Sequence, residues 1–352
     1  MWRWAITGML LAACGSPSGP ALPDDEVLWP EADALFHQDP RWLGGDAAFS
    51  VDLGGERTLW LFGDTFVGRS VGSDRTDAVM VRNTVGVMTG RDPSAATMDF
   101  AWREGDGPEA FFASDGDGFF WPGHGVRTDA GLTLFLQRVV LTDDDALGFR
   151  ADGWLAVRVD DPDAPPSEWS PRPLPGFELP EPIVMGVAVL RFEGHVYAYA
   201  VHEPGSHDVY VARWPEAELM TGPPAWYSGG AWIAHDALDG MPSPIIEDAQ
   251  TELSVHRLDD GRFVEVQSLG FGDTTIGIRT APRPEGPWSD AASVFRPPES
   301  RGDRPFVYAG KAHGELEGAP LIVTYADNAW DFGDLVRDEE LYFPHFLRLP
   351  AP

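Results

Sequence analysis

The sequence predicts an all-β protein folded as a five-bladed β-propeller, and two observations favour this class. The 352 residues include 39 Gly and 32 Pro, and the strand-like runs between them are short and numerous. A unit of three or four antiparallel strands also recurs five times between residues 27 and 350. A radial array of such units avoids open sheet edges, which favours a propeller. A pair of β-sandwiches is the structural alternative.

Five residues mark the expected first strands of the five units. These landmarks, 57 to 78 residues apart, are Asp46, His124, Gly186, Glu252 and Ala309. In a propeller the first strand of each unit lines the central channel, and the starts of these strands meet at one mouth. Polar side chains near the landmarks are therefore candidates for a shared site.

The N-terminal segment predicts export and lipid attachment. Residues 5–13 form an apolar run that is too short to span a bilayer but suits the core of a secretory signal. The run ends in Leu11-Ala-Ala-Cys14, which resembles the lipobox of bacterial lipoproteins, where the cysteine is acylated. We expect a signal peptide over residues 1–14 with lipidation at Cys14, a flexible tether over 15–26 and the propeller over 27–350. An incidental or buried cysteine is the alternative.

The composition limits the partners. A formal net charge of −31 argues against nucleic acid and anionic lipid surfaces as electrostatic partners. Contact with a membrane is therefore expected only through the anchor, which would place the protein in the cell envelope, at the outer membrane or cell surface. With one cysteine, the chain can form no intrachain disulfide. We expect a monomer.

The first unit begins with a hairpin that has a carboxylate at each end. Residues 47–53 and 58–62 are the two expected strands, joined by a turn at Gly54 and Gly55. Asp46 precedes the first strand and Asp64 follows the second, so an antiparallel hairpin would bring them together. Two close carboxylates can divide acid and base work, because proximity separates their pKa values. The alternative is that both are ordinary turn residues beside glycine.

Further polar residues are expected at the same mouth. The first strands of the later units supply His124, Glu252, Lys311 and His313. Each also has a structural explanation: His124 would cap a turn, Glu252 would be a solvated strand residue, and Lys311 would balance an acidic channel.

Two acidic loops raise the question of a metal. Residues 115–118 and 143–145 could bind Ca²⁺, but the first lacks the spacing and the closing Glu of an EF-hand loop. At this net charge, solvated acidic loops are the preferred interpretation. No cysteine or histidine spacing indicates zinc, and no Gly-x-Ser-x-Gly motif indicates an esterase. We therefore expect no cofactor.

Several motifs resemble domain-of-unknown-function family 4185 and its relatives. They are Leu59-Trp-Leu-Phe-Gly-Asp-Thr-Phe66, Arg82-Asn83, Trp121-Pro-Gly123, Thr251-Glu-Leu-Ser-Val255, Ile278-Arg-Thr-Ala-Pro-Arg-Pro-Glu-Gly-Pro-Trp-Ser289 and Tyr308-Ala-Gly-Lys-Ala-His313. That family is similar to five-bladed propeller glycoside hydrolases, and some members are endo-D-arabinanases. The resemblance implies a glycan-facing pocket with Asp46 and Asp64 as paired acids and Glu252 as a third. Related propellers have a carboxylate in the second blade, where this chain has His124.

These observations predict a lipid-anchored glycoside hydrolase acting on a polysaccharide, with arabinan-type chains as the candidate substrate. Asp46 would be the base or nucleophile, and Asp64 or Glu252 the acid. The expected substrate-binding residues are Arg82, Asn83, Trp121, His124, Lys311 and His313. Four tryptophans could stack on sugars, with core packing as the alternative: Trp60, Trp121, Trp226 and Trp330. The alternative function is a non-catalytic surface module that binds glycan or protein.

Overall fold

The computed structural model describes residues 24–143, 148–270, 272–301 and 305–352. The expected signal peptide, Cys14 and most of the expected tether lie outside these residues, as do Asp144 and Asp145 of the second acidic loop. Within the described ranges, no helix is long and apolar enough to cross a bilayer.

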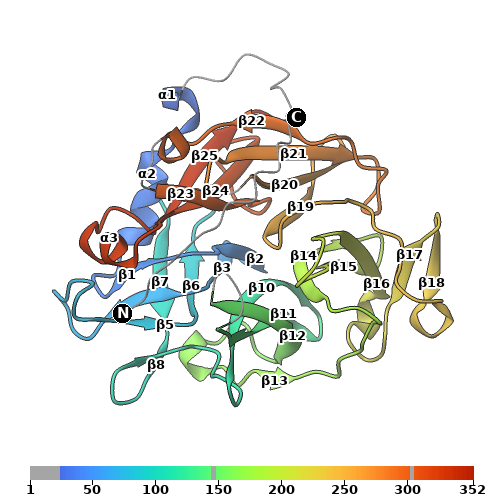
Figure 1. The fold of residues 1–352 in the computed structure, drawn as a ribbon, viewed down its shortest axis with the longest axis horizontal. Helices are drawn as coiled ribbons and strands as arrows, with labels where there is room; N and C mark the ends of the chain where they lie inside the picture. The colour runs from blue at the N-terminus through green and yellow to red at the C-terminus, as the bar shows by residue number, and fades with distance from the viewer. Residues whose placement is uncertain (1–23, 144–147, 271, 302–304) are drawn as a thin grey trace.

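Five antiparallel sheets follow one another along the described chain, and each is a meander of neighbouring strands (Figure 1). The first contains β2 (Phe49–Gly54), β3 (Arg57–Phe62), β6 (Thr84–Thr89) and β7 (Thr97–Ala101). The second contains β10 (Gly118–Thr128), β11 (Gly131–Leu141), β12 (Phe149–Val159) and β13 (Arg172–Pro173). The third contains β14 (Val184–Phe192), β15 (His195–Val201), β16 (Val209–Pro215), β17 (Ala225–Ser228) and β18 (Ala231–Ala234). The fourth contains β19 (Leu253–Arg257), β20 (Phe263–Leu269), β21 (Thr275–Ala281) and β22 (Ala292–Phe295). The fifth contains β23 (Pro305–Ala312), β24 (Leu321–Ala329) and β25 (Pro344–Leu349).

The first strands of these sheets lie side by side around a common centre. Strand β2 contacts β10, β10 contacts β14, β14 contacts β19, and β19 contacts β23 (Figure 1). The ring closes where Ser50 Oγ of β2 lies 2.6 Å from Nδ1 of His313, which follows β23. The protein is therefore all-β with a propeller arrangement, and the five landmarks of the sequence lie in or within three residues of these first strands.

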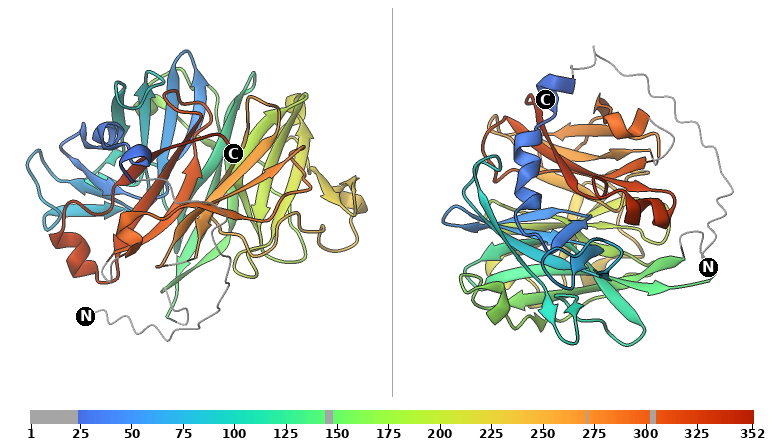
Figure 2. Two further views of the ribbon diagram at one scale, coloured as in Figure 1. Left: turned by 90° about the horizontal axis from the view of Figure 1, so that it is seen from above. Right: turned by 90° about the vertical axis from the view of Figure 1, so that its left-hand side faces the viewer.

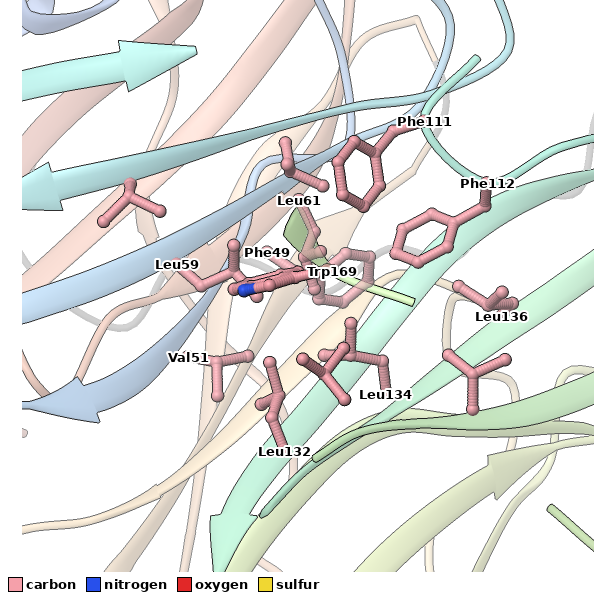
Figure 3. Close-up of a cluster of buried hydrophobic side chains, with 14 of the residues drawn as sticks. Phe49, Val51, Leu59, Leu61, Phe111, Phe112, Leu132, Leu134, Leu136 and Trp169 are labelled. Atoms are coloured by element: carbon pink, nitrogen blue, oxygen red, sulfur yellow. The ribbon is translucent and has the colours of Figure 1, made fainter. Parts of the chain in front are cut away.

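Hydrophobic side chains fill the spaces between neighbouring sheets. Strand β3 is buried on both faces, because its apolar run offers Leu59 and Leu61 to one neighbour and Trp60 and Phe62 to another. Figure 3 shows the first of these clusters, in which leucines of β3 and β11 meet and Trp169 covers them. The same cluster contains Phe49 and Val51 of β2, whose alternation fixes which residues of that strand face this core.

The N-terminal residues pack against the last sheet. Helices α1 (Asp24–Val27) and α2 (Pro30–Asp33), followed by the 3₁₀ turn Ala34–His37, contact or lie near β25, and they run along one side of the molecule (Figure 2). Leu28 forms an isolated bridge with Leu347, and Asp24 accepts two hydrogen bonds of 2.7 and 2.8 Å from Arg301. The expected tether was therefore placed too far along the chain at its last residues, since residues 24–26 are helical and bound.

The structure also contains smaller elements that the sequence did not predict. A three-stranded sheet contains β1 (Trp42–Gly45), β4 (Thr65–Gly68) and β5 (Ala78–Val81), and a two-stranded one contains β8 (Arg103–Glu104) and β9 (Pro108–Glu109). Helix α3 (Phe332–Arg337) follows β24, and further 3₁₀ turns span Pro166–Glu168, Glu216–Glu218, His235–Ala237 and Pro298–Arg301. Strand β1 ends just before Asp46, and β4 begins just after Asp64. This added sheet therefore supports the two carboxylates of the hairpin.

Candidate active site

The hairpin brings Asp46 and Asp64 together at one end of the channel. The backbone N–H of Asp46 donates to the carbonyl of Asp64 at 3.4 Å, and the N–H of Gly63 donates to the carbonyl of Asp46 at 3.1 Å. The expected proximity of the two residues is therefore confirmed. Their side chains also interact electrostatically, since the Asp64 carboxylate contributes to the raised pKa of Asp46.

Asp46 is surrounded by tyrosine hydroxyls and by other acids. The hydroxyl of Tyr308 donates to Asp46 Oδ2 at 2.7 Å, and the hydroxyl of Tyr342 also binds this carboxyl. Burial, followed by the charges of Asp64 and Glu252, raises the pKa of Asp46 from 3.8 to about 8. Asp46 therefore carries a proton at neutral pH.

Asp64 has partners that favour its charged form. Arg82 Nη1 donates to its Oδ2 at 3.0 Å, and Trp121 Nε1 donates to its Oδ1 at 2.9 Å. Burial raises the pKa of Asp64, while the Arg82 charge and both hydrogen bonds oppose that rise. Arg82 pairs with Asp64, whereas no cation of the described residues pairs with Asp46, so the surroundings of Asp64 favour the anion more than those of Asp46 do.

Glu252 is the third carboxylate, and it forms an ion pair with Lys311. Lys311 is almost fully buried, lies 4.4 Å from the centre of the Phe49 ring and donates to the carbonyl of Ala309 at 3.0 Å. Burial lowers the pKa of Lys311, and the Glu252 charge opposes that change. The pair thus joins the start of the fourth inner strand to the fifth, and its carboxylate faces the same group of acids.

The backbone around Asp46 is strained. Ala47 and Ala48, which follow Asp46, have φ of 65° and 56°, and Ala309 and Tyr342 have φ of 59° and 69°. Residues with a Cβ rarely adopt this left-handed region, and such strain gathers at functional sites. The Asp46 carboxylate also packs closely against the backbone of Gly63, because a Cβ on Gly63 would lie 2.4 Å from Asp46 Oδ1.

His124 does not offer a free group to a ligand. Its Nδ1 accepts a hydrogen bond from the N–H of Val189 at 2.8 Å, so its Nε2 carries the proton and donates to the carbonyl of Ser50 at 2.7 Å. Burial, with the charges of His256 and Lys311, lowers the pKa of His124 to about 3. His124 is a neutral link between the first three inner strands, and both of its ring nitrogens are already used in that link; its role in binding substrate stays a prediction.

His313 and Asn83 are structural for the same reason. His313 is 2% exposed, and its ring nitrogens lie 2.6 Å from Ser50 Oγ and 2.7 Å from Thr324 Oγ1. Asn83 is fully buried; its amide donates to two backbone carbonyls and accepts from the N–H of Phe112 at 2.6 Å. Neither can reach a substrate, so both predictions are wrong. The Lys311 ammonium is likewise occupied by its ion pair with Glu252.

The four tryptophans divide into two pairs. Trp60 and Trp226 have no exposed surface and belong to the core, so their assignment as sugar-stacking residues is wrong. Trp121 is half-buried and binds Asp64, and Trp330 is 37% exposed and packs on Phe306, the ring next to Tyr308. Only Trp121 and Trp330 can meet a ligand at this mouth.

Sequence reasoning missed the two tyrosines that bind Asp46. Tyr308 lies in the motif that also contains Lys311, so its position at the start of an inner strand was a usable signal. Tyr342 lies in a loop before β25 and has no such signal, because only the folded chain brings it to Asp46. His256 was also missed: its Nε2 lies 2.7 Å from the carbonyl of Ala312, one strand away in the channel.

The acidic loop at residues 115–118 is neutralised by arginine. Arg138 lies 2.9 Å from Asp117 Oδ1 and also pairs with Asp152. Among the described residues, no group of three or more histidine, cysteine or acidic side chains is arranged to hold a metal ion.

A cavity of about 440 Å³ lies at the opposite end of the first three sheets, away from the carboxylates. Its lining includes Arg57, Arg127 and Arg191. Asp163 pairs with the first two arginines and Glu216 with the third. Because these charges are already paired, the mouth with Asp46 has the stronger chemical case.

Known proteins resemble this chain in sequence family and in fold. The family described as Domain of unknown function (DUF5005) matches residues 31–351, so the resemblance to family 4185 is not the match found. No curated protein matches the chain. A protein from Bacteroides ovatus, provisionally described as a hydrolase, has 18% identity and a TM-score of 0.72 over 95% of this chain and 97% of its own. The α-L-arabinofuranosidase from Lactobacillus brevis has 12% identity and a TM-score of 0.52 over 88% and 91%. These likenesses establish the propeller fold.

Proposed function

The chain belongs to this DUF5005 family, and we propose that it is a glycoside hydrolase whose active site lies at the Asp46 mouth of a five-bladed propeller. The observation that carries the proposal is the carboxyl pair, in which a protonated Asp46 lies beside an Asp64 that is bound by a cation. The five meander sheets supply the five blades. The structural likeness to the arabinofuranosidase supports a polysaccharide containing arabinose as the first substrate to test.

The protonation pattern favours a division of roles opposite to the one that the sequence suggested for Asp46. Asp46 carries the proton, so it serves as general acid. Arg82 and Trp121 favour the anion of Asp64 against the effect of burial, so we assign Asp64 the role of base or nucleophile. Glu252 raises the pKa of Asp46 through its charge and acts as a positioning residue.

The proposed reaction is ordinary glycoside hydrolysis. Asp46 gives its proton to the glycosidic oxygen while the bond from that oxygen to the anomeric carbon breaks. Asp64 either attacks the anomeric carbon or takes a proton from the water that does so. Water supplies the hydroxyl on the anomeric carbon in either case. If Asp64 is the nucleophile, water then displaces it from the anomeric carbon and gives its proton to Asp46; if Asp64 is the base, the proton that it took from water is lost to solvent and Asp46 takes one up again. Tyr308 holds the Asp46 carboxyl in place throughout.

The remaining expectations concern location and assembly. We propose that the mature protein is attached through acylated Cys14 and faces the outside of the cell as a monomer. Labelling with a radioactive fatty acid, compared with a Cys14→Ser variant, tests the attachment; equal label in both proteins would reject it.

The hydrolytic proposal is tested with a panel of plant and bacterial glycans that includes arabinan and arabinogalactan. We expect the wild type to release reducing sugar from at least one of them, and Asp46→Asn to reduce that release by at least about 1,000-fold. Asp52→Asn is the matched control, because Asp52 is an exposed aspartate in β2, the strand that follows Asp46, at the end away from the mouth. If no glycan is cleaved but both proteins bind one, the protein is a surface-binding module instead.

A further inference from the structure

A row of aromatic rings leads away from Asp46 along the edge of the fifth sheet. The first ring is that of Tyr308, whose hydroxyl binds the Asp46 carboxyl. The Phe306 ring centre lies 5.5 Å from that of Tyr308, and the Trp330 ring centre lies 4.5 Å from that of Phe306. We call Tyr308, Phe306 and Trp330 the aromatic row.

The strand pairing explains why these rings gather at the mouth. Strand β23 starts at the mouth and β24 ends there, and Phe306 pairs with Asn328, two residues before Trp330. Asn328 also donates to the hydroxyl of Tyr308 at 3.3 Å. The end of β24 and the start of β23 are thus tied to the residue that holds Asp46, and Trp330 is placed just beyond them.

The outer end of the row faces solvent. Trp330 is 37% exposed, and Phe332 at the start of α3 is 51% exposed. These are two of four large hydrophobic side chains that are exposed in the described parts of the chain; Val71 and Leu141 are the others. An indole that is still 37% exposed at the outer end of a row that begins at a proposed catalytic acid is placed to contact a ligand.

The aromatic row and the net charge of the protein indicate which kind of ligand would bind there. An aromatic face packs well against the apolar face of a sugar ring, and it makes no demand for charge. The net charge of −31 disfavours acidic polysaccharides. We propose that Trp330 and Phe306 form a remote sugar-binding subsite, which holds an uncharged glycan one or more units away from the bond at Asp46. This inference rests on the proposed function and extends it to the length and charge of the substrate.

The subsite predicts a dependence on chain length. A glycan long enough to reach Trp330 gains binding energy there, whereas a short aryl glycoside occupies only the carboxylate mouth. Trp330→Ala should therefore lower kcat/KM on the polysaccharide by about tenfold, mainly through a higher KM. On the aryl glycoside, kcat/KM should change by less than about twofold. Trp330→Phe, which keeps an aromatic face, should recover most of the loss.

A matched control separates binding from damage to the fold. Trp102→Ala also removes an indole, from the outer strand region of the first sheet where Arg41 lies 5.0 Å from the ring centre. It should leave both substrates unaffected in kcat/KM. An equal loss for Trp330→Ala on the long and the short substrate, or no loss on either, would overturn the subsite while leaving the hydrolase proposal intact.

If no glycan is hydrolysed, binding measurements test the subsite instead. Affinity electrophoresis in gels that contain arabinan, arabinogalactan or another neutral glycan of the panel would then compare wild type with Trp330→Ala. Retardation of the wild type that is lost in the variant would support the subsite and reject the hydrolase. The absence of retardation for both proteins on every glycan would reject both proposals.

Discussion

The mouth and the interior of the channel are built from the same inner strands, and burial favours the neutral form of ionisable groups in both, but the two regions differ in the partners that these groups have. At the mouth, burial and then the charges of Asp64 and Glu252 raise the pKa of Asp46 to about 8, so that it keeps a proton. In the interior, His124 and His313 are neutral, and every ring nitrogen has a hydrogen-bond partner. The comparison shows that a polar residue on an inner strand is a candidate for chemistry only where its hydrogen bonds leave it able to exchange a proton.

Stability should therefore depend strongly on the interior. His313→Ala removes two buried hydrogen bonds and a ring that packs 4.7 Å from Trp60, so we expect a loss of about 3 kcal/mol in the free energy of unfolding. Asp64→Asn at the mouth should change that free energy by less than about 1 kcal/mol. Urea denaturation measures both. Equal losses for the two variants would remove the distinction between mouth and interior.

Activity should depend on the exact position of Asp46. A Cβ on Gly63 would collide with its carboxylate, so we expect Gly63→Ala to reduce hydrolysis by about 100-fold with little change in the unfolding midpoint. Gly176→Ala is the control, because a Cβ there meets no atom within 4 Å. Activity of Gly63→Ala within a factor of three of wild type would show that the position of Asp46 is unimportant.

The interior histidines should make the protein sensitive to acid. The pKa of His124 is about 3 in the fold and 6.5 when unfolded, so the unfolded chain binds more protons between these values. Stability is therefore complete above pH 6.5 and is lost as the pH falls toward 3. Between pH 6.5 and 5, the free energy of unfolding should fall by roughly 1–2 kcal/mol less in His124→Gln than in wild type. His195→Gln, at an outer turn, should follow the wild-type curve; parallel curves for His124→Gln and wild type would contradict the assignment.

Asp46 should show the opposite dependence on pH. Its pKa is raised from 3.8 to about 8 in the fold, so its contribution to stability is present below pH 3.8 and is lost as the pH rises through 8. Asp46→Asn cannot ionise, so this variant should be about 1–2 kcal/mol more stable than wild type at pH 9 while being inactive. Chemical denaturation at pH 5, 7 and 9 measures the difference. A variant that is less stable at pH 9 would indicate that Asp46 is charged and structurally required.

The smallest expected effect concerns the support of Asp64. Trp121→Phe keeps an aromatic ring but removes a hydrogen bond that lowers the pKa of Asp64. The pKa of Asp64 should rise further, which moves the acidic limb of the kcat/KM profile to higher pH and lowers the rate at pH 6. An unchanged acidic limb would show that Asp64 is not the ionised partner.

The sequence predicted the arrangement of strands well, because local patterns control it. The landmarks found the first strand of each sheet, and the hairpin turn at Gly54 and Gly55 located Asp46 beside Asp64. The same reasoning could not separate active from structural polar residues. Whether His124 is free depends on the carbonyl of Ser50 and the N–H of Val189, and these reach it only through the packing of neighbouring sheets.

Contacts between distant parts of the chain also lay beyond the sequence. Tyr342 reaches Asp46 because the chain returns to the first sheet before β25. Ala47 and Ala48 have a left-handed backbone, which the sequence could not indicate because alanine rarely adopts it. The extra sheet of β1, β4 and β5 was missed because its strands are short and interrupt the first meander.

The most direct test of the account is a carboxyl titration followed by NMR. Protein labelled with ¹³C at aspartate carboxyls would be titrated from pH 3 to 10, with Asp46→Asn and Asp64→Asn used to assign the two signals. The account predicts that Asp46 titrates near pH 8 and that Asp64 is already ionised at neutral pH. If both carboxyls titrate near pH 4, Asp46 holds no proton at neutral pH, and the proposed division of acid and base between them is wrong.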